Sequence, residues 1–168
     1  MRKHRLKISL ALIAALVIGY GLLQFQQNSQ APTFTFTTLE GKKISMADLQ
    51  GKLVLVNFWS INCLSCLKEM PELRELYQRY HGQGFELIAV AMDYDPPLQV
   101  LVYSQQKQLP FPVMHDGLGD ISAAFGEVTV TPSHFLYNQQ GQRLQRTIGR
   151  LDTKALAATL ERELAKPN

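Results

Sequence analysis

Residues 58–71 read FWSINCLSCLKEMP and hold both cysteines of the 168-residue chain, Cys63 and Cys66. The preceding residues, 52–59, form a nearly continuous apolar run, which is typical of a strand covered on both faces. Residues 63–80 have helical composition. The cysteines therefore stand where a buried strand ends and a helix begins. Because two residues separate them on the first helical turn, we expect Cys63 to be the exposed member and Cys66 to face inward. The N-terminus of a helix also stabilises a thiolate, the nucleophile of disulfide exchange.

A cysteine pair with this spacing has several interpretations. A structural disulfide usually joins distant elements, and one that closes so short a loop stabilises a fold poorly. Zinc needs four ligands and the chain has no second CxxC, whereas copper(I) accepts two thiolates. A thiol peroxidase would have Pro seven residues before its cysteine, where this chain has Val56. The residues favour a redox couple, with a metal-carrying pair as an alternative.

The positive charge is concentrated at the N-terminus. Four basic residues precede residue 8 and the formal net charge is only +3, so the rest of the chain is slightly acidic and no nucleic-acid partner is expected. Residues 8–25 begin with the uncharged run ISLALIAALVIGYGLL. We predict a cytoplasmic basic region over 1–7, an uncleaved signal anchor or transmembrane helix over 8–25 and a tether over 26–32, with a cleaved signal peptide as the alternative.

Strands and helices alternate from Thr33 onward, which predicts an α/β fold with a central mixed sheet. Asp120 is expected to cap one short helix. Residues 93–95 follow a buried strand and are interpreted as a polar loop that caps another helix, with a ligand site at the sheet edge as the alternative. The predicted elements are a hairpin over 33–46, strands over 52–59, 85–92 and 111–115, helices over 63–80, 95–108 and 120–125, a hairpin over 133–149 and a helix from Thr153.

The segment GKLVLVNFWSINCLSCLKEMPEL resembles the active-site region of the thioredoxin superfamily and is most similar to its membrane-tethered TlpA/ResA/CcmG-like branch. Three further segments match that branch in order: FTFTTLEGKKISMADLQGK, GFELIAVAMDYDP and VTVTPSHFLYNQQGQ. The resemblance covers residues 33–165. It implies a thioredoxin-like domain over 33–168, with an N-terminal β-hairpin and a central βα insertion, preceded by one membrane segment.

The resemblance also implies roles for individual residues. Cys63 matches the attacking thiol and Cys66 the resolving thiol. Thr131 and Pro132 match a cis-proline loop that faces the disulfide and binds substrate, although Pro132 could instead be an ordinary trans residue in a turn. Trp59 matches a tryptophan that packs beneath the site, for which a plain core position is the alternative.

Glu69 matches an acid that would move a proton to or from Cys66. A solvated helix residue is the alternative. Asn57 stands where soluble thioredoxins have a buried Asp, which leaves proton transfer to Glu69. His134 stands two residues after the proline, where Thr is usual, and it is interpreted as a strand residue rather than as part of the site.

Two other departures lie at the rim of the site. Asn62 replaces a second tryptophan, and Leu64-Ser65 lacks the proline that is common between the cysteines. The residues between the cysteines tune the thiolate, so the usual potential of the branch is not carried over.

The resulting prediction is a thiol–disulfide oxidoreductase, anchored in the bacterial inner membrane and facing the periplasm, that reduces specific protein disulfides. Cytochrome c precursors and copper-site proteins are among the candidate substrates. The implied partner is a membrane electron conduit of the DsbD/CcdA type, and no cofactor or metal is expected. The reductive direction rests on the resemblance alone. The alternative is a protein that binds copper with the same thiols and delivers it to a respiratory oxidase.

Overall fold

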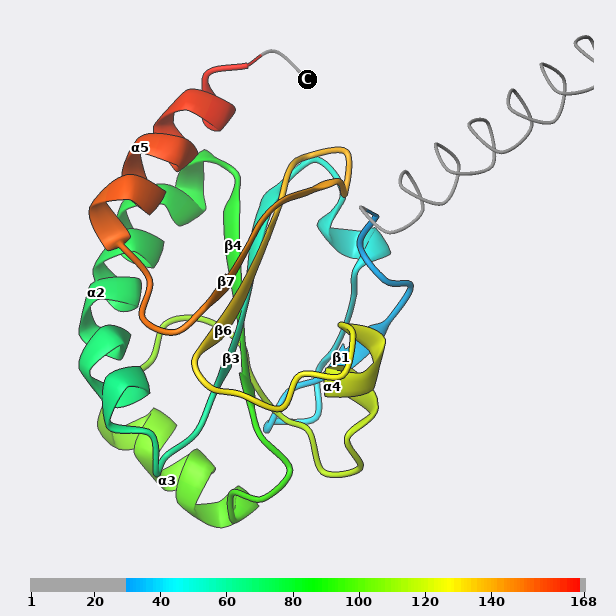
Figure 1. The fold of residues 1–168 in the computed structure, drawn as a ribbon, viewed down its shortest axis with the longest axis vertical. Helices are drawn as coiled ribbons and strands as arrows, with labels where there is room; N and C mark the ends of the chain where they lie inside the picture. Colours follow the sequence, from blue (N-terminus) through cyan, green and yellow to red (C-terminus); the bar gives the residue numbers. More distant parts are fainter. Residues whose placement is uncertain (1–29, 167–168) are drawn as a thin grey trace, which may run out of the picture. The chain divides into compact units, whose positions relative to one another are not determined.

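The computed structural model describes residues 30–166, which are built around one five-stranded mixed sheet of order β5-β4-β3-β6-β7 (Figure 1). Strands β3, β4 and β5 are parallel, whereas β6 runs antiparallel to β3 and β7 antiparallel to β6. The strands are β3 (Leu53–Trp59), β4 (Phe85–Ala91), β5 (Val113–His115), β6 (Ser133–Tyr137) and β7 (Arg143–Ile148).

The two central strands are buried along their whole length. All seven residues of β3 and all seven of β4 are buried, as the apolar runs predict for parallel strands covered on both faces. Strand β7 lies at the edge and carries mostly exposed residues. The antiparallel pair β6–β7 is joined by the short turn that the sequence predicts.

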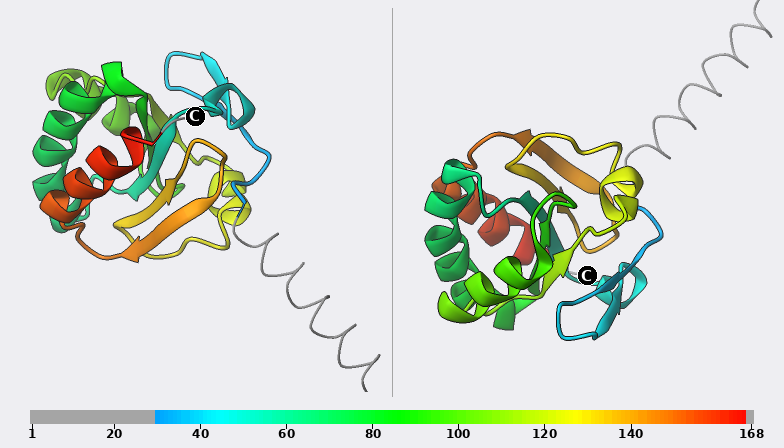
Figure 2. Two further views of the ribbon diagram at one scale, coloured as in Figure 1. Left: turned by 90° about the horizontal axis from the view of Figure 1, so that it is seen from above. Right: turned by 90° about the horizontal axis from the view of Figure 1, so that it is seen from below.

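Helices α2, α3 and α5 cover one face of the sheet (Figures 1 and 2). Their buried side chains share one core with alternate residues of β3, among them Leu55 and Trp59. Leu156 and Leu160 of α5 point into this core, as their helical spacing predicts. The helices are α2 (Leu64–Tyr80), which a 3₁₀ turn η2 (His81–Gln83) extends, α3 (Pro97–Gln106) and α5 (Thr153–Leu164).

The opposite face is covered by the N-terminal hairpin and one short helix. The hairpin pairs β1 (Thr35–Thr37) with β2 (Lys43–Ser45), and a 3₁₀ turn η1 (Ala47–Leu49) follows it. Helix α4 (Asp120–Ala124) packs on the same side through Ile121. The mixed sheet, the flanking helices and the hairpin agree with the predicted α/β fold.

The start of α4 differs from the prediction. Asp120 lies inside the first turn and does not cap the helix. The N-cap residue is Gly119, which has no side chain, and the carboxylate of Asp116 instead accepts hydrogen bonds from the backbone N–H groups of Ile121 and Ser122, both at 2.8 Å. Gly119, at φ 73°, turns the chain between them. A side chain from the preceding turn thus replaces the cap that sequence position suggested.

The N-terminal predictions lie largely outside the described residues. The basic region 1–7, the anchor 8–25 and most of the tether 26–32 fall there. Within residues 30–166, no helix combines the length and the apolar character needed to cross a bilayer.

Candidate active site

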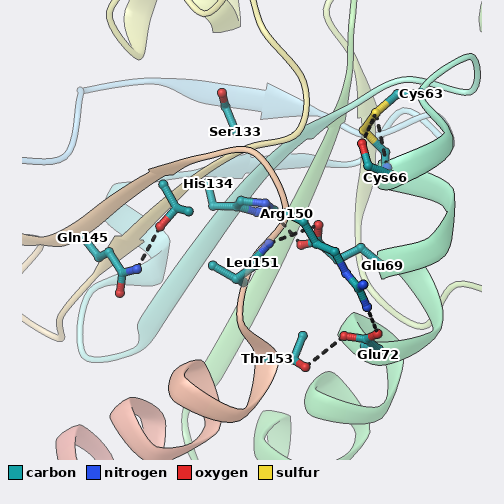
Figure 3. Close-up of polar contacts among 12 residues, drawn as sticks. Cys63, Cys66, Glu69, Glu72, Ser133, His134, Gln145, Arg150, Leu151 and Thr153 are labelled. Atoms are coloured by element: carbon teal, nitrogen blue, oxygen red, sulfur yellow. Dashed lines mark hydrogen bonds and ion pairs between the residues drawn. A yellow bond between two sulfur atoms is a disulfide. The ribbon is translucent and has the colours of Figure 1, made fainter.

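Cys63 and Cys66 are joined by a disulfide at the start of α2 (Figure 3). Cys63 is the N-cap of the helix, and its sulfur accepts a hydrogen bond from the backbone N–H of Cys66 at 3.2 Å. The Sγ of Cys63 also lies 3.3 Å from the hydroxyl of Ser65. Cys63 is half-buried, whereas Cys66 is only 1% exposed. A partner's sulfur can therefore reach Cys63, and after reduction the helix N-terminus favours its thiolate form.

The loop that leads from β3 to Cys63 is held by a buried carboxylate, Asp95. Its two oxygens accept hydrogen bonds from the hydroxyl of Ser60 at 2.8 Å and from the backbone N–H of Ile61 at 3.0 Å. The ring Nε2 of His115 lies 2.7 Å from the carbonyl oxygen of Asp95. The interpretation of residues 93–95 as a helix cap is therefore wrong for Asp95. Helix α3 has Pro96 at its N-cap and no side-chain cap, since the carboxylate points to the cysteine loop instead.

Glu69 lies on α2 one turn beyond Cys66 and is 1% exposed. Its Oε2 accepts a long hydrogen bond, 3.5 Å, from the backbone N–H of Leu151. The alternative of a solvated helix residue is therefore wrong. Figure 3 shows the carboxylate directed from α2 toward β6 and the chain after β7.

His134 meets Glu69 from the sheet. Its Nε2 lies 3.1 Å from Oε1 of Glu69, although their mutual orientation is not that of a hydrogen bond, and the imidazole is 1% exposed. His134 lies in β6, as predicted, and stands opposite Asn57 of β3 in the register. Its place beside Glu69 differs from the prediction of a strand residue outside the site, because nothing in the chain order places it beside α2.

The remaining predicted residues gather at the carboxyl end of β3. The Thr131–Pro132 peptide bond is cis, as the resemblance implies, and Pro132 is buried. Ser133, which follows Pro132, pairs with Phe58, which precedes Trp59, so the cis-proline loop leaves the sheet at the end of β3 where the cysteine loop begins. Trp59 is fully buried, and its ring packs against that of Tyr103 with centroids 5.3 Å apart.

Comparison with known proteins gives a consistent result. The model of the AhpC/TSA family matches residues 28–142. The thiol-disulfide oxidoreductase ResA of Bacillus cereus is 34% identical over 172 residues, which cover 96% of this chain and 98% of that protein. The chain belongs to the AhpC/TSA family and is a ResA-like thiol–disulfide oxidoreductase.

Solved structures similar to this ResA-like chain support the same fold. A thioredoxin-like protein from Neisseria meningitidis, solved in solution, has a TM-score of 0.77 at 35% identity and covers 83% of this chain and 93% of its own. A thioredoxin-family thiol:disulfide interchange protein from Chlorobium tepidum has a TM-score of 0.75 at 25% identity, over 82% of this chain and 97% of its own. The thioredoxin-like α/β fold predicted from the sequence is confirmed.

Several apolar side chains of this ResA-like protein are exposed on the segments that lead to and from the cysteine pair and the cis proline; we call them the apolar rim. Leu64, between the cysteines, is 67% exposed. On one side Ile61 joins exposed residues of α3, Leu98 and Val102, in lining a shallow groove. The chain before the cis proline and the end of β7 add two further exposed residues, Val130 and Ile148.

The alternative function, copper delivery, would need a copper site at the cysteine pair, and the described residues add no further ligands there. Within residues 30–166, no three His, Cys, Asp or Glu side chains are grouped as metal ligands. Copper(I) binding by the two thiols alone stays a hypothesis.

Proposed function

We propose that this protein reduces disulfides of exported proteins from the outer face of the bacterial cytoplasmic membrane. The observation that carries the proposal is the unequal exposure of the two sulfurs at the start of α2. Cys63 is reachable, whereas Cys66 lies behind it and is 1% exposed. An attacking thiol needs access to a bulky substrate, and a resolving thiol needs access only to its neighbour.

The reaction runs in two exchange steps. The Cys63 thiolate attacks one sulfur of a substrate disulfide and forms a mixed disulfide, while the other substrate sulfur leaves as a thiolate and takes a proton from solvent. Cys66 then loses its proton, attacks Cys63 and closes the Cys63–Cys66 disulfide, and the second substrate thiolate is released and protonated. Two electrons pass from the enzyme to the substrate, so no cofactor takes part in this scheme.

Glu69 is the proposed acceptor of the Cys66 proton. It follows Cys66 by one helical turn and is shielded from water, which favours transfer to the carboxylate over transfer to solvent. The backbone N–H of Leu151 donates a hydrogen bond to Oε2 of Glu69, which limits the orientation of the carboxylate.

The substrate binds, in this proposal, against the cis-proline loop and the apolar rim. The backbone of Thr131 is the part of this loop that would pair with an extended substrate segment, because Pro132 has no N–H and its carbonyl oxygen already accepts a hydrogen bond from the backbone N–H of Gly149 at 2.8 Å. The fully buried Trp59 would pack under the cysteine loop. The exposed Leu64 and Ile148 suit apolar residues that flank the substrate cysteine.

Re-reduction requires a source of electrons. We assign it to a membrane conduit of the DsbD/CcdA type, with the protein held beside it by an inner-membrane anchor over 8–25 and its domain in the periplasm. Cell fractionation and thiol trapping in cells with and without the conduit test this assignment. A cysteine pair that stays oxidised in both strains would contradict the reductive direction.

Single cysteine variants test the mechanism. With insulin as substrate, Cys63→Ser abolishes reduction, because no nucleophile is left at the surface. Cys66→Ser accumulates a mixed disulfide between Cys63 and the substrate, which non-reducing electrophoresis detects. Full insulin reduction by Cys63→Ser would overturn the assignment of the attacking thiol.

A further inference from the structure

A group of unpaired polar atoms lies between helix α2 and the strands β3 and β6. Among residues 30–166, five buried side-chain nitrogen or oxygen atoms have no hydrogen-bond partner. They are Oε1 of Glu69, both ring nitrogens of His134, Oδ1 of Asn57 and Nε1 of Trp59. Burial of such an atom without a partner is unfavourable, because the atom has given up its hydrogen bonds to water. Their concentration at one place calls for a functional explanation, because packing alone would favour apolar residues there.

Strand alternation places these groups on the same face of the sheet. Leu55 and Trp59 of β3 pack with α2, whereas Val56 and Phe58 belong to the opposite core, so Asn57 faces α2. The same alternation in β6 turns His134 to the α2 side together with Leu136, away from Phe135. Glu69 then approaches His134 from the helix.

We propose that His134 shares, with Glu69, the proton that Cys66 gives up when it attacks Cys63. This inference rests on the resolving step proposed above. The Cys66 proton passes to the Glu69 carboxylate and is then divided between that carboxylate and the imidazole. It leaves to solvent after the disulfide closes, and the reverse path supplies a proton when Cys66 is reduced again. His134 acts through Glu69 and is a positioning residue.

The charge balance favours a pair over a lone acid. A buried carboxylate without a partner is unfavourable, and its burial is offset when a cation or a proton donor faces it. Once the pair has accepted a proton, it is neutral overall, whether the proton sits on the carboxylate or on the imidazole. The 3.1 Å separation of Nε2 and Oε1 requires only a change of ring orientation to complete a hydrogen bond.

The other groups around the pair are engaged or do not titrate. On α2 the nearby acid is Glu72, which binds Arg150 of the chain after β7 and accepts a hydrogen bond from the hydroxyl of Thr153 at α5 (Figure 3). Thr147 of β7 stands opposite His134 in the register, and its hydroxyl accepts a hydrogen bond from Gln145. From β3 come only the amide of Asn57 and the indole of Trp59. The thiol of Cys66 is thus the group whose proton the pair would exchange.

The rate at which the mixed disulfide resolves provides the test. The full-length protein is reduced, mixed with a short peptide disulfide and quenched with acid at intervals, from about pH 5 to pH 9, where imidazoles titrate. We expect His134→Gln to slow resolution about tenfold at neutral pH and to change its pH profile. Formation of the mixed disulfide by Cys63 stays at the wild-type rate. Glu69→Gln slows resolution at least as much, and the double variant is no slower than Glu69→Gln alone, since both act in one transfer.

The matched control is His81→Gln, because His81 lies at the far end of α2 and stacks on Tyr77. It should reproduce the wild-type profile. A wild-type pH profile in His134→Gln would overturn the inference, whereas a wild-type protein that never forms the mixed disulfide would contradict the proposed function instead.

A second measurement covers the case in which His134→Gln does not fold. The imidazole nitrogen signals of His134 in the wild-type protein, followed by NMR, should titrate differently in the disulfide and dithiol states. Identical titrations in both states would overturn the inference.

Discussion

Asp95 holds the backbone of the cysteine loop although it belongs to a distant segment. Its carboxylate is 1% exposed and accepts hydrogen bonds from the Ser60 hydroxyl and the Ile61 N–H. Removal of the carboxylate leaves two donors without their acceptor at a position that leads directly to Cys63. Asp95 is therefore expected to affect both stability and the placement of the attacking thiol.

We predict that Asp95→Ala lowers the free energy of unfolding by about 1–3 kcal/mol, the cost of unmade buried hydrogen bonds. Urea denaturation of the oxidised protein measures it. Asp93→Ala is the control, because Asp93 is exposed in the same loop and should change stability little. Equal losses in the two variants would contradict the role given to Asp95.

Glu69 and His134 differ in how far the sequence could reveal them. Glu69 follows Cys66 by three residues on one helix, so spacing alone puts it near the buried thiol. His134 reaches the same place only because β6 pairs with β3 and packs under α2. A histidine in a strand-forming segment carries no local signal of its partner, so the sequence predicts only its place in a strand.

Helix α5 illustrates an element whose start is determined locally. Asp152 precedes the helix, and its carboxylate accepts hydrogen bonds from the N–H groups of Lys154 and Ala155, both at 3.0 Å. The leucines of the helix then fall on one buried face. Both features follow from residues close in sequence, so the start predicted at Thr153 agrees with the structure.

Removal of this cap should weaken the whole domain. We predict that Asp152→Ala lowers the free energy of unfolding by about 1 kcal/mol. Asp152→Asn keeps a capping oxygen and should therefore lower it much less. Thermal unfolding followed by circular dichroism compares the two. The same loss in both variants would show that charge, not capping, is responsible.

At the scale of the whole molecule, buried tyrosines determine how the free energy of unfolding changes at high pH. Burial raises the pKa of Tyr137 to about 12. Burial, followed by the nearby charge of Glu86, also raises the pKa of Tyr77. In the unfolded chain both phenols ionise near pH 10. Ionisation therefore favours the unfolded state above about pH 10. Below that pH the two phenols are neutral in both states, and their full contribution to the stability of the fold is retained.

We predict that the free energy of unfolding of the wild-type protein falls as the pH rises from about 10 to 12. In Tyr137→Phe, this fall should be about 2 kcal/mol smaller than in the wild type. Denaturant unfolding at a series of pH values measures the difference. Tyr94→Phe is the control, because Tyr94 is 58% exposed, and it should follow the wild-type curve. A Tyr137→Phe curve parallel to that of the wild type would refute the prediction.

The sequence by itself determined the cysteine pair, its place between a buried strand and a helix, and the order of the elements. These features depend on neighbours along the chain: apolar runs, helix spacing and turn residues. Only the tertiary structure decided that Asp95 holds the cysteine loop and that His134 faces Glu69. Those contacts join distant segments, and they depend on which face of the sheet each side chain takes. That choice is set by strand register and helix packing, which no local pattern encodes.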